Sequence, residues 1–299
     1  MSFESLMRAV QRLSASSEAL AALGGELRLR QSGEESDPRT RQLLHDVIRG
    51  IDSTLLDGVS PEQEAIALAV IRSGYHYTID LLDKPGRAPG WLHEDEEILQ
   101  TIGKQSRRLA HQINTFAGRN PEFHQTLTSP GSFLDIGTGV GWLAIEAAQL
   151  WPALKIIGVD VWEPSLQLAR ANIAISGMQN RITVRTQNIV DLDEKEAFTV
   201  VFLPAPFLPY EVAVTAIERA YRALVRGGWL IFGIFTSQPD PLGEALAALR
   251  IVRCGGYPWK TPEVEERLRG VGFEQIEIFA PGMGSIQVFG RKPAKSGCD

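Results

Sequence analysis

FLDIGTGVGWLAIEAA, residues 133–148, carries the clearest structural signal in the chain. An apolar strand pattern runs into a turn with a glycine at every second position and then directly into an apolar helix pattern. Gly137, Gly139 and Gly141 allow a sharp turn and a close approach to a ligand, because each lacks the Cβ that would fill that space. The helix N-terminus adds N–H groups without partners inside the helix. The segment therefore predicts a turn that binds a nucleotide-like ligand.

The spacing of the next residues argues against a dinucleotide ligand. The G-x-G-x-x-G pattern of dinucleotide sites needs a small residue where this chain has Trp142. The following apolar run, KIIGVD, ends on Asp160, 23 residues after Gly137. Such folds place an acid that accepts hydrogen bonds from ribose hydroxyls at an interval of ~20 residues. We interpret Asp160 as this ribose-binding acid, and the competing interpretation is an N-cap for the helix that Pro164 begins.

From residue 132 onward, short apolar runs alternate with helical segments, which is typical of βαβ units around a parallel sheet buried on both faces. Pro164 begins a helix that Gly177 ends, and a helix through Ala216 ends before Gly227. Two late runs flank the sequence PGMGS and predict a closing hairpin. The expected strands are residues 133–136, 155–159, 182–186, 199–203 and 230–235, with the hairpin at 275–279 and 286–289.

The first part of the chain shows helical spacing only. Apolar residues recur there at intervals of three and four. A Ser-Pro-Glu start predicts a helix over residues 60–82, and a further helix is expected over residues 94–116. We therefore expect a helical cap or dimerisation domain at residues 1–128 and a ligand-binding α/β domain at residues 129–299.

Composition narrows the class of protein. The chain has 299 residues, and 44% of them are hydrophobic, which is enough for a sizeable core. Lys and Arg number 30 against 36 Asp and Glu, so a net charge of −6 gives no attraction to nucleic-acid phosphates. Cys254 and Cys298 have no spacing typical of a disulfide framework or a metal site. Without an 18-residue apolar run or a signal-like start, we expect a cytoplasmic protein that binds neither membrane nor nucleic acid.

Over residues 132–293 the chain resembles the class I S-adenosylmethionine-dependent methyltransferases. DIGTGVG looks like the first motif of that family, GVDVWEPSLQLARAN resembles the motif at its second strand, and FTVVFLPAPF resembles the motif at its fourth strand. The resemblance implies S-adenosyl-L-methionine as cofactor and S-adenosyl-L-homocysteine as product. It also implies an α/β fold, a Rossmann-like seven-stranded and mostly parallel sheet with helices on both faces and a reversed last strand, here preceded by an all-helical N-terminal domain.

The resemblance also assigns cofactor-binding residues. Asp135 and the backbone of the glycine turn would contact the methionine portion, Asp160 the ribose hydroxyls and Val161 the adenine. Asn188 stands where the family often has an Asp that accepts from the adenine amino group, and its side-chain oxygen can still accept that bond. The residues expected to bind cofactor are Asp135, Gly137, Thr138, Gly139, Gly141, Asp160, Val161, Asn188, Ile189 and Pro204.

By the same resemblance, the sequence PAPF at residues 204–207 is expected to lie beside the methyl acceptor. Some amino-methylating relatives carry Asn or Asp here, followed by Pro-Pro and an aromatic residue, and hold a planar amino group with that side chain. Pro204 has no such side chain, so amino methylation loses support, although the Pro204 carbonyl can still accept a bond. Phe207, Tyr210 and Trp259 are expected to line the acceptor pocket, and plain packing is the competing interpretation.

A hydroxyl or acidic carbon acceptor needs a base, and all five histidines lie in the helical part of the chain. His93, in GWLHEDEEIL, and His76, between two tyrosines, are the candidates, and surface or packing roles compete with both. Arg107 lies where relatives often contact the cofactor carboxylate, with a solvated helix face as the other interpretation. Cys254 has no paired base beside it in sequence and is expected to be structural.

The expected function is therefore methyl transfer to a small molecule, with O- or C-methylation favoured and a homodimer contact through the helical domain. Methylation of a protein stays open, whereas RNA loses support because no basic extension is present. A noncatalytic scaffold that binds cofactor is a third interpretation, against which the intact Asp135, the glycines and Asp160 count. A nicotinamide-dependent oxidoreductase shares the fold class and is the fourth.

Overall fold

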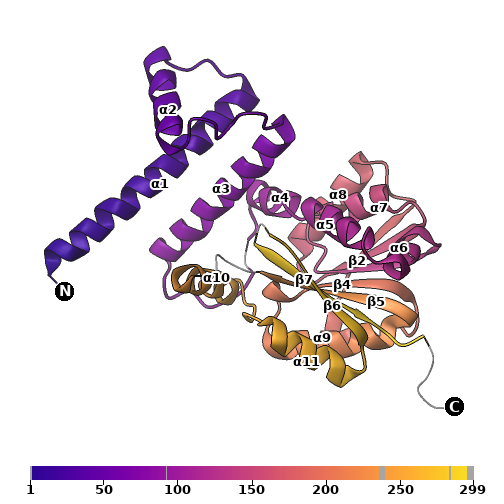
Figure 1. Ribbon diagram of the computed structural model, residues 1–299. Helices are drawn as coiled ribbons and strands as arrows, with labels where there is room; N and C mark the ends of the chain where they lie inside the picture. The colour runs from indigo at the N-terminus through magenta and orange to yellow at the C-terminus, as the bar shows by residue number, and fades with distance from the viewer. Residues whose placement is uncertain (1, 92, 236–239, 283, 295–299) are drawn as a thin grey trace. The chain divides into compact units, whose positions relative to one another are not determined.

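The computed structural model describes residues 2–91, 93–235, 240–282 and 284–294. The chain forms two compact units, Met1–Pro85 and Gly86–Asp299 (Figure 1). The helices between Gly86 and residue 128 belong to the unit that holds the sheet, and the functional division predicted at residue 128 stays a prediction. None of the helices in the described ranges is long and apolar enough to cross a bilayer.

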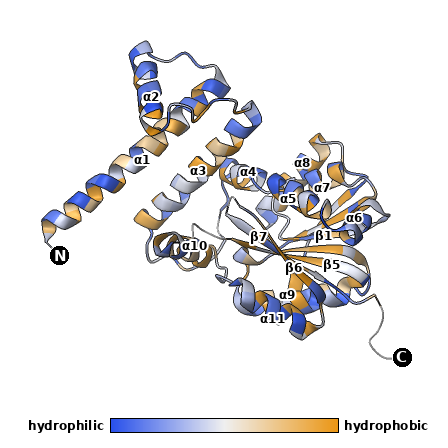
Figure 2. Ribbon diagram, in the orientation of Figure 1, coloured by the Kyte–Doolittle hydropathy of each residue, from blue (hydrophilic) through white to orange (hydrophobic). Residues whose placement is uncertain are grey.

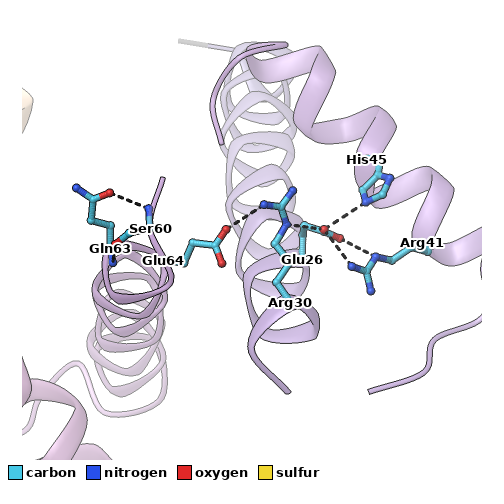
Figure 3. A network of polar contacts seen from close by, with 7 residues as sticks. All are labelled: Glu26, Arg30, Arg41, His45, Ser60, Gln63 and Glu64. Carbon is cyan, nitrogen blue, oxygen red and sulfur yellow. Dashed lines mark hydrogen bonds and ion pairs between the residues drawn. The ribbon is translucent and has the colours of Figure 1, made fainter. Parts of the chain in front are cut away.

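Three helices make up the first unit. They are α1 (Phe3–Ser32), α2 (Pro38–Ile51) and α3 (Pro61–Asp83). Ser60 and Gln63 form a capping box at the start of α3: the Ser60 hydroxyl accepts from the Gln63 N–H, and the Gln63 side chain accepts from the Ser60 N–H (Figure 3). The helix predicted over residues 60–82 is therefore confirmed. Both α2 and α3 pack against α1.

The centre of the first unit is charged. Glu26 of α1 is fully buried, and its Oε1 accepts from Arg30 Nε at 3.0 Å and lies 3.2 Å from His45 Nε2 (Figure 3). Arg41 Nε lies 3.2 Å from Glu26 Oε2, within ion-pair distance although its N–H does not point along a hydrogen bond. Arg30 also donates to Glu64 of α3 at 2.9 Å. Ion pairs thus connect α1 to both of its neighbours.

The second unit contains one sheet and its covering helices. Its helices are α4 (Glu96–Lys104), α5 (Arg107–Ala117), α6 (Pro121–Thr128), α7 (Trp142–Leu150), α8 (Glu163–Ile175), α9 (Tyr210–Ala223), α10 (Pro241–Arg253) and α11 (Thr261–Val271), with 3₁₀ turns at Ile189–Asp191 and Ala205–Phe207. Its strands are β1 (Gly131–Ile136), β2 (Leu154–Asp160), β3 (Ile182–Thr186), β4 (Phe198–Pro204), β5 (Leu224–Phe235), β6 (Glu274–Gly282) and β7 (Ser285–Arg291). All seven predicted strand segments are confirmed within these bounds.

The helix predicted over residues 94–116 is wrong in one respect, because the structure breaks it into α4 and α5. Gln105 and Ser106 lie in a turn between them, which the Ser106 hydroxyl stabilises by donating to the Gly103 carbonyl at 2.7 Å. Gly103 packs so closely on Val140 that a Cβ would lie 2.1 Å from the Val140 side chain. The break therefore lets α4 rest on the glycine turn while α5 covers the sheet.

The strand order of the sheet is β3-β2-β1-β4-β5-β7-β6. Strands β1 to β5 pair in parallel, and β7 is antiparallel to both β5 and β6. This arrangement confirms the predicted fold class, the reversed last strand included. Because β1 lies between β2 and β4, the connections reverse direction there, and the carboxyl ends of β1 and β4 border the crevice in which open α/β sheets bind ligands.

Helices cover both faces of the sheet (Figure 1). On one face Phe133, Trp229 and Phe289 pack with α5, α6 and α7. On the other face Leu230 and Phe232 pack with α9 and α11. The orange along much of β5 in Figure 2 reflects this burial on both sides. Each large apolar side chain buried in this way contributes about 1.5–3 kcal/mol, which keeps the carboxyl ends of the strands in fixed places.

Candidate functional site

The glycine turn between β1 and α7 has the left-handed backbone that the glycines predict. Gly137, Gly139 and Gly141 have φ angles of 63°, 55° and 84°, a region that favours glycine. A Cβ on Gly137 would lie 3.2 Å from the ring of Pro204. The segments that follow β1 and β4 therefore meet at the crevice in which open α/β sheets bind ligands. The N–H groups of Thr138, Gly139 and Gly141 are taken up by hydrogen bonds within the protein.

Asp135, near the end of β1, is 1% exposed. Thr138 Oγ1 donates to its Oδ2 at 2.7 Å, and a Cβ on Gly158 of β2 would lie 2.7 Å from that hydroxyl, so glycine leaves room for Thr138. Burial raises the pKa of Asp135 to about 7, opposed by the Thr138 hydrogen bond and reinforced by the charge of Asp160. Neither of these neighbours is a cation, so the carboxyl suits a cationic group brought by a ligand.

Asp160 ends β2 and ties the glycine turn to the next loop. Its Oδ2 accepts from the Gly139 N–H and its Oδ1 from the Trp162 N–H, each at 2.8 Å. Burial raises the pKa of Asp160, and hydrogen bonds from the backbone of Trp162, Gly139 and Val161 lower it. α8 begins at Glu163 without a side-chain cap, so Asp160 does not cap that helix. Each carboxylate oxygen keeps a further lone pair with which to accept from a ribose hydroxyl.

The residues predicted to bind adenine lie at the ends of β2 and β3. Val161 is 62% exposed, which leaves its side chain open to pack on a ring. The Asn188 side-chain oxygen accepts from the Val190 N–H at 3.2 Å and caps the 3₁₀ turn that follows. The Ile189 side chain is 4% exposed and packs in the core on the α9 side, so its backbone alone can face a ligand.

The sequence did not predict a group of polar residues from neighbouring helices that bonds to the glycine turn and to the start of α7. Asn172 of α8 donates to the Val140 carbonyl at 2.8 Å. Gln100 of α4 accepts from the Trp142 indole at 2.8 Å and donates to Asn172 at 3.0 Å. These residues come from three helices, and no spacing in the sequence links them. The one local signal was Gly103, whose missing Cβ lets α4 approach.

An aromatic cluster lies at the carboxyl ends of β4 and β5. Phe207 packs edge-on against Trp91 and Phe235, with ring centroids 5.3 Å and 5.4 Å apart. His93 lies edge-on to Trp91 at 4.7 Å, and the His93 carbonyl accepts from the Trp162 indole at 2.8 Å. The structure thus connects one predicted base, His93, with one predicted pocket residue, Phe207, through a tryptophan that the sequence did not single out for this role.

The other predicted acceptor residues lie in different places. Tyr210 stacks on Trp259 at 5.1 Å, and Trp259 packs edge-on against Phe232 of β5 at 5.5 Å. Trp259 is 5% exposed and therefore belongs mainly to the core. His76 lies on α3 in the first compact unit, where its ring is edge-on to Tyr77 at 5.9 Å. Roles for these residues in binding or catalysis remain predictions.

Arg107 contacts the neighbouring helix α7. Arg107 is half-exposed and pairs with the buried Glu146 of α7 at 2.6 Å, with its guanidinium 5.6 Å from the Trp142 ring. This favours an exposed helix face for Arg107 over a contact with the cofactor carboxylate. Cys254 is buried, and Cys298 lies outside the described residues. Among the described residues, no group of three or more His, Cys, Asp or Glu is arranged to hold a metal ion.

Comparison with known sequences gives a family match within the sheet unit. Residues 133–228 match the model of a family described as a methyltransferase domain. A ribosomal protein uL3 glutamine methyltransferase from Bordetella pertussis is 34% identical over 89 residues, which is 30% of each chain. A ribosomal protein L11 methyltransferase from Bacillus licheniformis is 26% identical over 211 residues, 68% of this chain and 64% of that protein. The chain thus spans less than two thirds of the length of these relatives.

Solved structures share the fold over almost the whole chain. Human N-acetylserotonin methyltransferase, solved in complex with SAM, has a TM-score of 0.68 at 15% identity and covers 96% of this chain and 98% of its own. An O-methyltransferase family protein from Burkholderia thailandensis has a TM-score of 0.68 at 15% identity and covers 99% of each chain. Identities this low show the fold alone. Residues 133–228 therefore match a methyltransferase domain, and the sheet unit has the same fold as these solved methyltransferases.

Proposed function

We propose that this protein transfers the methyl group of S-adenosyl-L-methionine to a small-molecule acceptor, by O- or C-methylation, and releases S-adenosyl-L-homocysteine. The observation that carries the proposal is the aromatic cluster of Trp91, Phe207 and Phe235 beside His93, at the carboxyl end of the sheet. Apolar walls with few polar groups are typical of small-molecule sites. The cytoplasmic location expected from the sequence remains part of the proposal.

The residues of the sheet unit fit the proposed cofactor, which would supply a methyl group activated on a sulfonium. Asp160 would accept from the ribose hydroxyls and Val161 would pack on the adenine. Asp135 and the backbone of the glycine turn would face the methionine portion. The fit rests on Asp135: its neighbours Thr138 and Asp160 supply a hydroxyl and a second negative charge, so a cationic ligand would stabilise the ionised carboxyl.

His93 is the proposed base. The bound cofactor would supply the methyl carbon to the acceptor oxygen or carbon and would keep the electrons of the broken carbon–sulfur bond on sulfur, and the acceptor would lose a proton. A neutral imidazole at position 93 can take that proton. Trp91 and Phe207 would exclude water from the reacting atoms. His76 is retained as an alternative base, and Tyr210 and Trp259 as further pocket residues.

A protein substrate is the second candidate, because both sequence relatives are named as methyltransferases of ribosomal proteins. Pro204 counts against methylation of a glutamine side chain, since proline offers no side-chain acceptor to hold the planar amide. The net charge of −6 counts against RNA, which requires a basic surface. A small acceptor therefore remains the better-supported proposal.

We also propose that the helical unit forms a homodimer contact. On α1, Phe3, Leu6, Val10 and Leu13 are 43% to 74% exposed and recur at intervals of three and four, along one helix face. An apolar stripe of this size favours a protein partner, and a second copy offers the same stripe. Sedimentation of the full chain should show a dimer that the double variant Leu6→Asp, Leu13→Asp converts to a monomer. A wild-type monomer at micromolar concentration would contradict this.

Calorimetric titration with S-adenosylmethionine, S-adenosylhomocysteine and NADH tests the cofactor assignment. We expect the first two to bind and NADH not to bind. Asp160→Ala should weaken binding by about a hundredfold or more, because two charge-assisted hydrogen bonds are worth about 1.5–3 kcal/mol each. Glu218→Ala, an exposed carboxylate of α9, is the matched control and should bind as the wild type does. Binding of NADH, or of none of the three, would overturn the proposal.

Formation of S-adenosylhomocysteine over a panel of hydroxyl and acidic-carbon compounds tests the acceptor. Turnover of a small molecule supports the proposal, and turnover with a ribosomal protein alone would replace it with the second candidate. With a hydroxyl acceptor, His93→Gln should lower kcat by about 10²–10⁴, the usual contribution of a positioned base. An unchanged kcat in that variant would remove His93 from the mechanism and direct attention to His76.

A further inference from the structure

Trp162 contacts both the predicted ribose acid and the predicted base. Its backbone N–H donates to Asp160 Oδ1 at 2.8 Å, and its indole N–H donates to the His93 carbonyl at 2.8 Å. The side chain is partly buried, directly after β2. One residue therefore links the carboxylate at the cofactor side to the backbone of the segment that carries the base.

The segment that carries His93 also reaches the acceptor side. The ring of Trp91 lies edge-on to His93 at 4.7 Å and edge-on to Phe207 at 5.3 Å. Phe207 follows Pro204, whose ring lies close to Gly137 of the glycine turn. Trp91 thus places the ring of His93 next to the residues that follow β4.

A second anchor holds the other end of this segment. The Gly90 N–H donates to the Arg253 carbonyl at 3.1 Å. A Cβ on Gly255 would lie 3.1 Å from the Gly90 Cα, and a Cβ on Gly256 would lie 1.9 Å from the Pro206 carbonyl oxygen. Backbone therefore packs directly on backbone at this end, which leaves little freedom of movement. At the His93 end the indole hydrogen bond is a side-chain contact, and a side chain is easier to release than packed backbone.

We propose that Trp162 is a positioning residue: when a ligand occupies Asp160, the ordered turn at residues 160–162 fixes the indole, and the indole fixes His93 and Trp91 beside the acceptor. The inference rests on the proposed binding of the cofactor ribose at Asp160. The physical reason is that the carboxylate accepts from the Trp162 N–H and from the ligand at the same time. A ligand that orders the bond between Asp160 and the Trp162 N–H therefore also orders the bond between the Trp162 indole and the His93 carbonyl.

Hydrogen exchange measured by mass spectrometry on the full chain, with and without S-adenosylhomocysteine, tests this coupling. In the wild type, ligand should slow exchange about fivefold or more both in peptides of the glycine turn and in peptides that contain Trp91 and His93. Trp162→Phe keeps the ring and removes the indole N–H. In this variant the glycine turn should keep its protection, and the peptides with Trp91 and His93 should lose most of theirs.

Trp151→Phe is the matched control, because it removes an indole N–H that donates to Asn114 of α5 at 3.2 Å and not to His93. Its protection pattern should equal that of the wild type. Equal protection of the His93 peptides in Trp162→Phe and wild type would overturn the positioning role while leaving the cofactor assignment intact. Absence of ligand protection at the glycine turn of the wild type would instead overturn the cofactor assignment, and the positioning role with it.

Discussion

Two carboxylates, one in each compact unit, are buried to the same extent but have opposite surroundings. Glu26 of the helical unit is fully buried, and Arg30, Arg41 and His45 lie against its oxygens (Figure 3). Asp135 of the sheet unit is 1% exposed, and its neighbours are a threonine hydroxyl and a second carboxylate. Glu26 is paired with arginine side chains of the protein, whereas the two neighbours of Asp135 carry no positive charge.

The difference separates a structural charge from a functional one. Arg30 and Arg41 compensate the loss of hydration of Glu26 when the helices pack, and Arg30 also pairs with Glu64, so these charges hold α1, α2 and α3 together. The pKa of Asp135 is raised to about 7 by burial, so this carboxyl destabilises the unliganded fold when it ionises. A carboxyl that destabilises the unliganded protein in this way is typical of a binding site in which a cationic ligand stabilises the ionised form.

Removal of the structural charge should have the largest effect. Glu26→Ala should lower the free energy of unfolding of the helical unit by about 2–4 kcal/mol, because it leaves a cavity and a cluster of positive charges. The arginines and His45 are 33% to 44% exposed, so water relieves part of the repulsion and keeps the loss below that of a fully buried pair. Urea unfolding followed by circular dichroism measures the change.

The matched control is Asp46→Asn, which removes the carboxylate of an exposed ion pair with Arg49. That change should cost far less than Glu26→Ala, because water screens an exposed ion pair. Equal effects of the two substitutions would contradict the structural role of Glu26. The two units must be followed separately, since a chain with two compact units need not unfold in one transition.

Asp135→Asn should have a smaller effect with the opposite sign. The pKa of Asp135 is about 7 in the folded chain and 3.8 as a free side chain, so the folded state holds the proton more tightly and stability falls as pH rises from about 4 through 7. Asn cannot ionise, which avoids a cost of up to about 4 kcal/mol at pH 8. Its buried amide N–H groups offset part of that gain, so we expect the unliganded variant to be more stable than wild type by about 1–3 kcal/mol at pH 8. Thermal unfolding from pH 4 to pH 8 should show the difference growing with pH. A constant difference would contradict the raised pKa.

The sequence predicted the fold well because its signals are local. Period-two and period-3.6 patterns set strands and helices, and β3 matches its prediction residue for residue. β5 begins at Leu224, six residues earlier than predicted, because Leu224 pairs with Phe198 across a register shift. The break between α4 and α5 was missed because it depends on Gly103 meeting Val140, a contact between distant parts of the chain.

In the candidate site, too, the features set by local sequence were predicted and the contacts between distant residues were not. Positive φ angles at the glycine turn and an acid at the end of β2 follow from short-range rules, and both were predicted. The bond from Trp162 to the His93 carbonyl joins residues 69 positions apart and leaves no periodic trace in the sequence. The helical unit shows the same limit, since the partners of Glu26 come from two helices. The sequence thus predicted the local conformation of the backbone but not which side chains would contact one another.

Proton release on cofactor binding gives a second test of the difference between Asp135 and Glu26. If a cation of the proposed cofactor lies near Asp135, it lowers the pKa of that carboxyl, so binding of S-adenosylmethionine near pH 6.5 should release a fraction of a proton. Calorimetry in two buffers with different ionisation enthalpies measures that fraction. Asp135→Asn should abolish it, while Glu26→Gln, in the other unit, should leave it unchanged. Release that persists in Asp135→Asn would assign the proton to another group.

The smallest expected effect concerns the hydroxyl beside Asp135. Thr138→Val removes the donor to the carboxyl and keeps the side-chain volume in the space that Gly158 leaves free. Because that bond lowers the pKa of Asp135, its loss should raise the pKa further and weaken S-adenosylmethionine binding at pH 7 about fivefold, near 1 kcal/mol. At pH 9 the carboxyl is ionised in both proteins, so most of the difference should disappear. A loss of affinity that does not change between pH 7 and pH 9 would mean that Thr138 acts on the ligand directly and not through the carboxyl.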